Sequence, residues 1–108
     1  MKLITKEIEK KLAKYPLYSQ ENKGDEAVVI AKFFPPWGGM SFYATEGNKT
    51  DDGDIEFFGL ITNCGEAEYG YFNLSQLEEV RGPWGLKVER DLYFKGTIKD
   101  AKEDARVA

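Results

Sequence analysis

The apolar positions near the N-terminus recur at the spacing of an amphipathic helix. One stripe holds four apolar residues at intervals of four, four and three: Ile4, Ile8, Leu12 and Tyr15. Thr5 can cap this helix, because its hydroxyl can accept a hydrogen bond from a free N–H of the first turn. Pro16 cannot continue a helix. The pattern therefore predicts a helix from Thr5 to about Tyr15.

Four later segments have the composition or the alternation of β-strands. They are residues 27–34, 40–45, 55–63 and 66–73. The first is rich in β-branched and aromatic residues and is followed by two prolines and a glycine-rich turn. In the last, Tyr69 and Tyr71 lie on one face of the strand and Phe72 lies on the other. Four successive short strands favour an antiparallel sheet.

Two segments after the strands read as capping boxes. Ser75 and Glu78 predict a short helix that ends by Gly82, and Thr97 and Asp100 predict a charged helix near the end of the chain. We therefore expect one α+β domain over residues 1–96, with an antiparallel sheet of about four strands, an N-terminal helix and a short helix after the fourth strand. Residues 97–108 are expected to form a charged C-terminal tail or a fraying helix.

The composition excludes several kinds of catalytic, metal-binding and disulfide site. The 108 residues include no histidine and one cysteine, with 14% aromatic residues. Catalytic triads that need histidine are excluded, and neither a structural zinc site nor an internal disulfide can form. Cys64 is expected to be a free thiol without a catalytic role. We predict no cofactor and no catalytic residues.

The segment Asn48–Asp54 resembles a calcium-binding loop in part. An EF-hand needs a glutamate at its twelfth position, and that position here is Gly59. The flanking segments also read as strands. We therefore predict a hairpin loop and no metal site.

Charge is distributed unevenly within a net charge of −4. Residues 15–80 contain twelve acidic residues and three lysines, which argues against binding of a phosphate backbone. This acidic segment is compatible with a basic partner, and the alternative is a solvated surface that keeps the protein soluble. The chain has no apolar run of about 20 residues and no uninterrupted signal segment, so we expect a cytoplasmic protein without membrane contact.

Two tryptophans lie in turns rich in proline and glycine. Trp84 is expected to pack between the short helix and the apolar segment 86–94, and to contribute more to folding than Trp37, which is expected to be exposed. Arg81 lies beside Trp84, with Lys87 and Arg90 nearby. Arg90 could bind a carboxylate and hold its segment against the sheet.

Much of the chain resembles the DUF2958 family. The similar segments are MKLITKEIEKKL, VVIAKFF, FYATE, DIEFFGL and EAEYGYFNLSQLEEVRGPWGLKVERDLYF, which together extend from Met1 to about Phe94. The family comprises small bacterial proteins of unknown function, often found on mobile elements. The resemblance implies a bacterial cytoplasmic setting and a role in mobile-element biology, but it assigns no activity, site residue or cofactor.

The leading hypothesis is a non-enzymatic accessory module that binds a macromolecular partner, a protein by preference. One form of it is a mimic of nucleic acid that occupies a basic groove. The hypothesis assigns partner binding to five residues: Trp37, Glu46, Arg81, Trp84 and Arg90. One alternative is nucleic-acid binding through Trp37, Trp84, Arg81, Lys87 and Arg90. Another is a small enzyme that uses carboxylates as acid and base.

Overall fold

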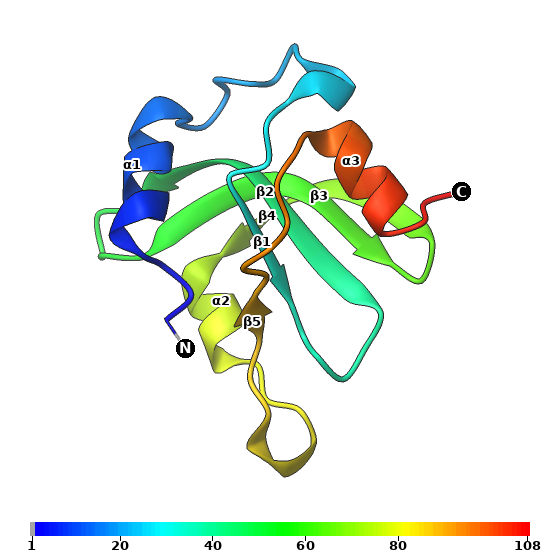
Figure 1. Ribbon diagram of the computed structural model, residues 1–108. Coiled ribbons are helices and arrows are strands. Elements are labelled where there is room, and N and C mark those ends of the chain that lie inside the picture. Colours follow the sequence, from blue (N-terminus) through cyan, green and yellow to red (C-terminus); the bar gives the residue numbers. More distant parts are fainter. Residues whose placement is uncertain (1) are drawn as a thin grey trace.

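The computed structural model describes residues 2–108 and has the predicted α+β architecture. The helices are α1 (Lys6–Lys14), α2 (Leu74–Glu79) and α3 (Ile98–Asp104), with short 3-10 turns η1 (Gly24–Glu26) and η2 (Pro83–Gly85). The strands are β1 (Ala31–Phe34), β2 (Met40–Lys49), β3 (Ile55–Asn63), β4 (Glu66–Asn73) and β5 (Glu89–Arg90). They form one antiparallel sheet in the order β4-β3-β2-β1-β5 (Figure 1).

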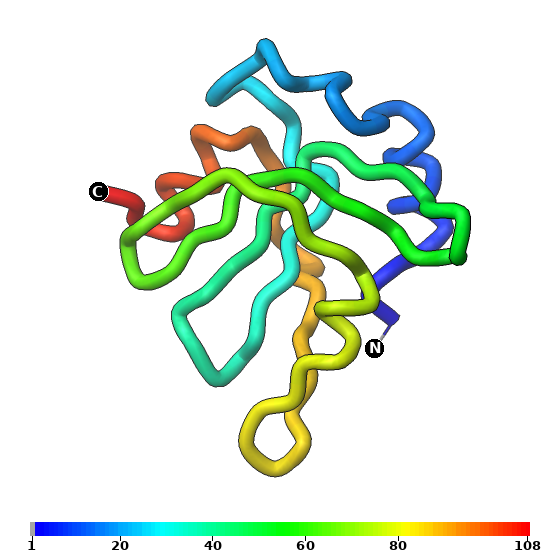
Figure 2. The backbone as a smooth tube through the Cα atoms, turned by 180° about the vertical axis from the view of Figure 1, so that it is seen from behind, coloured from blue at the N-terminus to red at the C-terminus, as the bar shows by residue number. Residues whose placement is uncertain are grey.

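Both faces of the sheet carry a buried apolar cluster. On one face, Phe33 and Phe57 pack with residues of α1 and α2, including Leu12 and Leu77. On the other face, Tyr43 and Leu60 pack with Ile98 and Ala101 of α3. Figure 2, which views the backbone from behind, shows α1 (blue) and α3 (orange to red) on opposite sides of the central segments of the chain. The molecule therefore has three layers.

Several elements form where the local pattern predicts them. The hydroxyl of Thr5 accepts a hydrogen bond from the N–H of Ile8 at 3.3 Å and caps α1. The predicted bounds of the third and fourth strands are those of β3 and β4. Thr97 and Asp100 make the predicted capping box at the start of α3.

Strands β1 and β2 differ from the prediction because of long-range pairing. β1 begins only at Ala31, since Val28 instead forms a bridge with Thr97. β2 continues past residue 45 to Lys49, and its register with β3 shifts between Ala44 and Glu46. Such a bulge breaks the alternation of apolar and polar residues, which is why the sequence pattern appeared to end there.

Two further differences concern the second half of the chain. The cap of α2 is Asn73, paired with Gln76, and not Ser75 as expected. A fifth strand, β5, adds to the four expected strands, because residues 89–90 pair with Phe33 and Phe34 of β1.

The segment 97–108 contributes to the core, although we expected a charged tail or a fraying helix. Ile98 and Ala101 are fully buried beside Tyr43. The apolar face of α3 is not evident from the sequence pattern, because the helix has only seven residues and most of them are charged.

Candidate functional site

The most prominent surface feature is a loop that projects from the body of the protein, which we call the Trp84 loop (residues 80–88). It extends away from the sheet in both Figure 1 and Figure 2. Its two arms are joined by a bridge between Arg81 and Lys87 and by a hydrogen bond of 2.8 Å from the N–H of Gly82 to the carbonyl of Leu86. These bonds close the loop on itself and limit its freedom.

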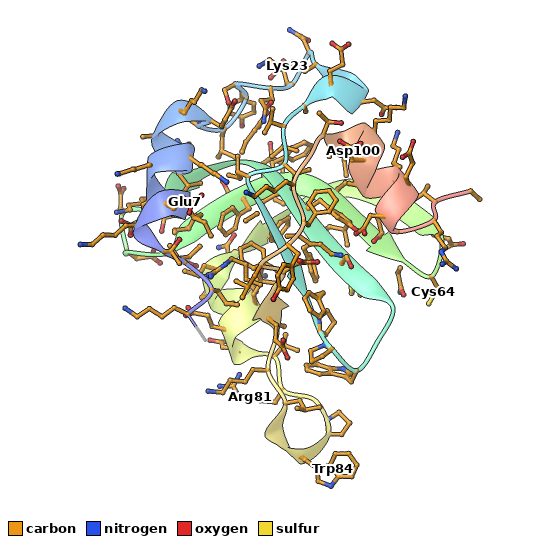
Figure 3. The ribbon with its side chains drawn as sticks, viewed as in Figure 1. Glu7, Lys23, Cys64, Arg81, Trp84 and Asp100 are labelled. Carbon is orange, nitrogen blue, oxygen red and sulfur yellow. The ribbon has the colours of Figure 1, made fainter. Side chains whose placement is uncertain are left out.

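Trp84 occupies the tip of this loop, and its side chain points into solvent (Figure 3). It is 98% exposed, with a backbone φ of 54°. Residues other than glycine seldom adopt this left-handed conformation, which costs energy. The expectation that Trp84 packs between two elements is therefore wrong.

Trp37 has the role that we had assigned to Trp84. It is partly buried, and its ring lies against Gly82 at the base of the Trp84 loop, so closely that a Cβ on this glycine would lie 2.3 Å from the ring. The expectation of an exposed Trp37 is also wrong. Glycine at position 82 makes room for the ring, and local sequence around Trp37 contains no sign of this distant partner.

Two of the predicted basic residues, Arg81 and Arg90, donate hydrogen bonds to backbone carbonyls. The Arg81 guanidinium donates to the carbonyls of Glu78 at 2.5 Å and Val80 at 2.9 Å. Arg90 donates to the carbonyls of Lys2 at 2.5 Å and Leu3 at 3.1 Å, and so holds the N-terminal segment against β5. Of the five residues assigned to partner binding, Trp84 and Arg81 lie on the Trp84 loop, with Trp37 beneath it. Lys87, which the nucleic-acid alternative adds, also lies on the loop.

Glu46 lies away from this loop and is buried. Its carboxylate accepts hydrogen bonds from the N–H groups of Tyr18 at 2.7 Å and Gln20 at 2.8 Å. The side chain therefore fixes the turn after α1 onto β2. This charged residue can be buried because both of its carboxylate oxygens are hydrogen-bonded.

A cluster of ionisable residues lies between β1, β2 and α3. Lys32 forms ion pairs with Asp104 at 2.7 Å and Asp91 at 3.3 Å, and the Tyr43 hydroxyl donates to Asp104 at 2.7 Å. Burial, followed by the hydrogen bond with Asp104, raises the pKa of Tyr43 to about 12. Burial opposes the charge of Lys32, but its bonds with Asp104 and Asp91 outweigh this and raise its pKa.

The interactions of this cluster connect structural elements to one another. A tyrosine and a lysine with raised pKa values keep their protons near neutral pH, so neither is ready to act as a general base. Burial acts to raise the pKa of Asp91, but the N–H groups of Tyr93 and Phe94 and the ammonium of Lys32 lower it overall. The ionised pairs attach α3 and the segment after β5 to the sheet.

In the loop between β2 and β3, the Asp52 carboxylate is hydrogen-bonded within the turn. The Thr50 hydroxyl donates to Asp52, and the Thr50 N–H donates to the Asp54 carbonyl at 2.9 Å. Within residues 2–108, no three Cys, Asp or Glu side chains are grouped so that they could hold a metal ion. Cys64 is exposed and forms no disulfide in the tight turn between β3 and β4 of the described residues.

A group of aromatic side chains at one face of the sheet was absent from the predicted site. Tyr18, Tyr69 and Tyr71 are exposed, and Phe58, which contacts the last two, is half-buried. The alternation of the two tyrosines along β4 was a usable signal, because it placed both on one face of the strand. The sequence did not show that this part of the face would remain uncovered.

Comparison with known proteins gives one finding about family. The family described as "Protein of unknown function (DUF2958)" matches residues 3–102, which is nearly the whole chain. No curated protein and no solved structure matches significantly. Over residues 2–108, none of the helices has the length and apolar character needed to cross a membrane.

Proposed function

We propose that this chain, which belongs to the DUF2958 family of proteins of unknown function, is a non-enzymatic module that binds a partner protein through the Trp84 loop. The observation that carries the proposal is Trp84 itself, a fully exposed tryptophan in a strained backbone conformation at the tip of a closed loop. Strain of this kind is maintained where presentation of a side chain matters. Tryptophan is also among the residues that contribute most to protein interfaces.

The surroundings of Trp84 suit a protein more than a nucleic acid. Val80 and Leu86 are exposed on the same loop and add apolar contact area. Residues 78–90 hold three acidic and three basic side chains, so this region has no excess of positive charge with which to attract phosphates. Trp37 and Arg90, which the nucleic-acid alternative requires, are engaged within the fold.

The enzyme alternative receives less support from the ionisable groups. Among residues 2–108, the carboxyl groups with a displaced pKa are Asp52, Asp54 and Asp91, and each is displaced downward. A carboxylic acid that donates a proton near neutral pH needs a raised pKa.

The family resemblance further supports a bacterial cytoplasmic setting and a role in mobile-element biology, which we include in the proposal.

The test compares proteins captured from host-cell extract by the wild type and by Trp84→Ala, followed by calorimetry with the purified partner. We expect the variant to bind more weakly by about 2 kcal/mol or more, as for an interface hot spot. Its unfolding free energy should change by no more than about 0.5 kcal/mol, because the exposed ring makes few contacts. Tyr93→Ala removes another exposed ring and serves as the matched control.

Two results would contradict the proposal. One is capture of the same proteins, with the same affinity, by the wild type and Trp84→Ala. The other is that nuclease treatment of the extract abolishes capture by the wild type, which would favour the nucleic-acid alternative.

A further inference from the structure

A second surface lies on the face of the sheet that α3 partly covers, and we call it the tyrosine surface (Tyr18, Phe58, Tyr69 and Tyr71). The three tyrosines are 65%, 45% and 51% exposed. Tyr69 and Tyr71 flank Phe58, whose ring stacks on Tyr69 at 5.8 Å and contacts Tyr71 at 5.0 Å between centroids. The helix α3 covers Tyr43 and Leu60 on this face, and the aromatic residues beyond it remain open to solvent.

These rings are held in position by the fold. Tyr71 pairs with Phe58 and Tyr69 pairs with Leu60 across β3 and β4, so their side chains share one face of the sheet. Tyr18 has a positive φ of 72°, its N–H is bound by the carboxylate of Glu46, and its side chain is hydrogen-bonded to Tyr71. A surface fixed in this way loses little conformational freedom when it binds a ligand.

A cavity of about 290 Å³ opens beside Phe58 and Tyr69, with Ala27 and Glu21 among its other walls. Its walls are mainly apolar, and its volume is at the lower limit of ligand pockets. The cavity therefore suits one long side chain better than a cofactor.

Acidic side chains border this surface. Glu21 borders the cavity, and Glu46 and Glu56 lie beside Phe58 on the same face. The hydrogen bond with Tyr18 raises the pKa of Tyr71, and the charges of Glu56 and Glu46 raise it further. A nearby cation, Lys102, is paired with Asp25 at 2.7 Å. The surface thus favours cations and repels phosphates.

We propose that the tyrosine surface binds a cationic segment of a protein, with an arginine side chain seated in the cavity beside Phe58 and Tyr69. Arginine combines a flat cation, which stacks on aromatic rings, with donors that suit carboxylates. The carboxylate available to the guanidinium is Glu21, because Glu46 is already bound by backbone N–H groups. This surface is separate from the Trp84 loop and does not depend on the function proposed for it.

The experiment measures, by calorimetry, the binding of a blocked peptide of alternating arginine and glycine, and of the same peptide with lysine. We expect the arginine peptide to bind more tightly. Tyr69→Ala should weaken its binding about tenfold, the factor that corresponds to 1.4 kcal/mol. Tyr69→Phe, which keeps the ring, should retain binding, and Trp84→Ala should leave it unchanged.

A charge-matched pair of variants separates this site from general attraction to an acidic protein. Glu21→Gln should weaken binding of the arginine peptide, whereas Glu79→Gln, on α2 at the opposite face of the sheet, should change it little. Equal losses in the two variants would overturn the proposal, as would equal affinity for the lysine peptide. The proposal would also be overturned if the wild type bound single-stranded oligothymidylate and Tyr69→Ala abolished this binding, since the rings would then stack on bases.

Discussion

At the scale of single residues, the contact between Trp37 and Gly82 explains the different positions of the two tryptophans. Gly82 has a φ of −101° and a ψ of −164°, which any residue can adopt. Its importance therefore lies in the missing side chain, because the Trp37 ring fills the space where a Cβ would be. This contact supports the base of the loop that presents Trp84.

Gly82→Ala should lower the unfolding free energy by about 1–3 kcal/mol, the usual cost of overpacking. In a Trp37→Ala background the same substitution should cost much less, because the ring that it displaces is absent. Denaturant-induced unfolding of the two single variants and the double variant measures this coupling. A full cost of Gly82→Ala in both backgrounds would show that the ring contact is not responsible.

At the scale of elements, Asp54 connects the start of β3 to the start of α2. Its carboxylate accepts from the hydroxyl of Ser75 at 2.6 Å and from the N–H of Ser75 at 3.0 Å. The side-chain amide of Asn73, the cap of α2, also donates to it at 3.3 Å. Ser75 thus acts through a bond to the neighbouring strand and not as the cap that the sequence pattern predicted.

Asp54→Asn should destabilise the protein at pH 7 by about 1 kcal/mol, as for the loss of a helix cap. The hydrogen bond from Ser75 is the main cause of the lowered pKa of Asp54. A carboxyl whose folded-state pKa is lowered stabilises the protein above its ordinary value of 3.8, and this contribution disappears as pH falls through the lowered value. Urea unfolding should therefore show a difference between wild type and variant that shrinks toward pH 2. A constant difference would contradict this account.

The attachment of α3 depends on the proton of Tyr43. Burial and the bond to Asp104 raise the pKa of Tyr43 to about 12, from an ordinary value of 10.0. The protonated form is therefore favoured by folding. Its contribution is fully present below pH 10 and is lost as pH rises from 10 to 12.

Ultraviolet titration of tyrosinate should accordingly include a late component with a pKa of about 12, and Tyr43→Phe should remove this late component. The pKa of Tyr71 is also raised, so the ionisation of Tyr71 should remain in that variant. The unfolding free energy of the wild type should fall over the same pH interval, and less steeply in the variant. Lys32 also has a raised pKa, so part of the fall should remain in Tyr43→Phe. Loss of the late component in Tyr71→Phe instead would show that the assignment is wrong.

At the scale of the whole molecule, the three layers depend on a short C-terminal helix. The helix α3 supplies Ile98 and Ala101 to the cluster around Tyr43 and Leu60. Asp104 adds the bonds to Lys32 and Tyr43. Without this helix, one face of the sheet would expose its apolar residues to water.

Ile98→Ala should lower the unfolding free energy by about 2–5 kcal/mol, because its side chain is fully buried. That is a large part of the roughly 5–15 kcal/mol that stabilises a domain. Deletion of residues 97–108 should therefore leave a chain that does not fold, as measured by near-ultraviolet circular dichroism. The exposed neighbour provides a control, since Lys99→Ala should cost no more than about 0.5 kcal/mol. A cooperative thermal transition in the truncated chain would contradict the role of α3.

Local sequence was sufficient for some elements and for one part of the candidate surface. The helix α1 and the strands β3 and β4 follow from apolar spacing, a capping residue and glycine at the turns, all of which act over a few residues. The alternation along β4 likewise placed Tyr69 and Tyr71 on one face. These features required no knowledge of which segments would meet.

Only the tertiary structure decided which aromatic rings are covered. Trp37 is sheltered because Gly82, far along the chain, leaves room for its ring, and Trp84 is exposed because its loop closes on itself away from the sheet. Tyr69 and Tyr71 remain open because α3 covers Tyr43 but not the rest of that face. Burial depends on contacts between distant segments, whereas periodicity depends only on neighbours, and the candidate binding surfaces of this protein are defined by burial.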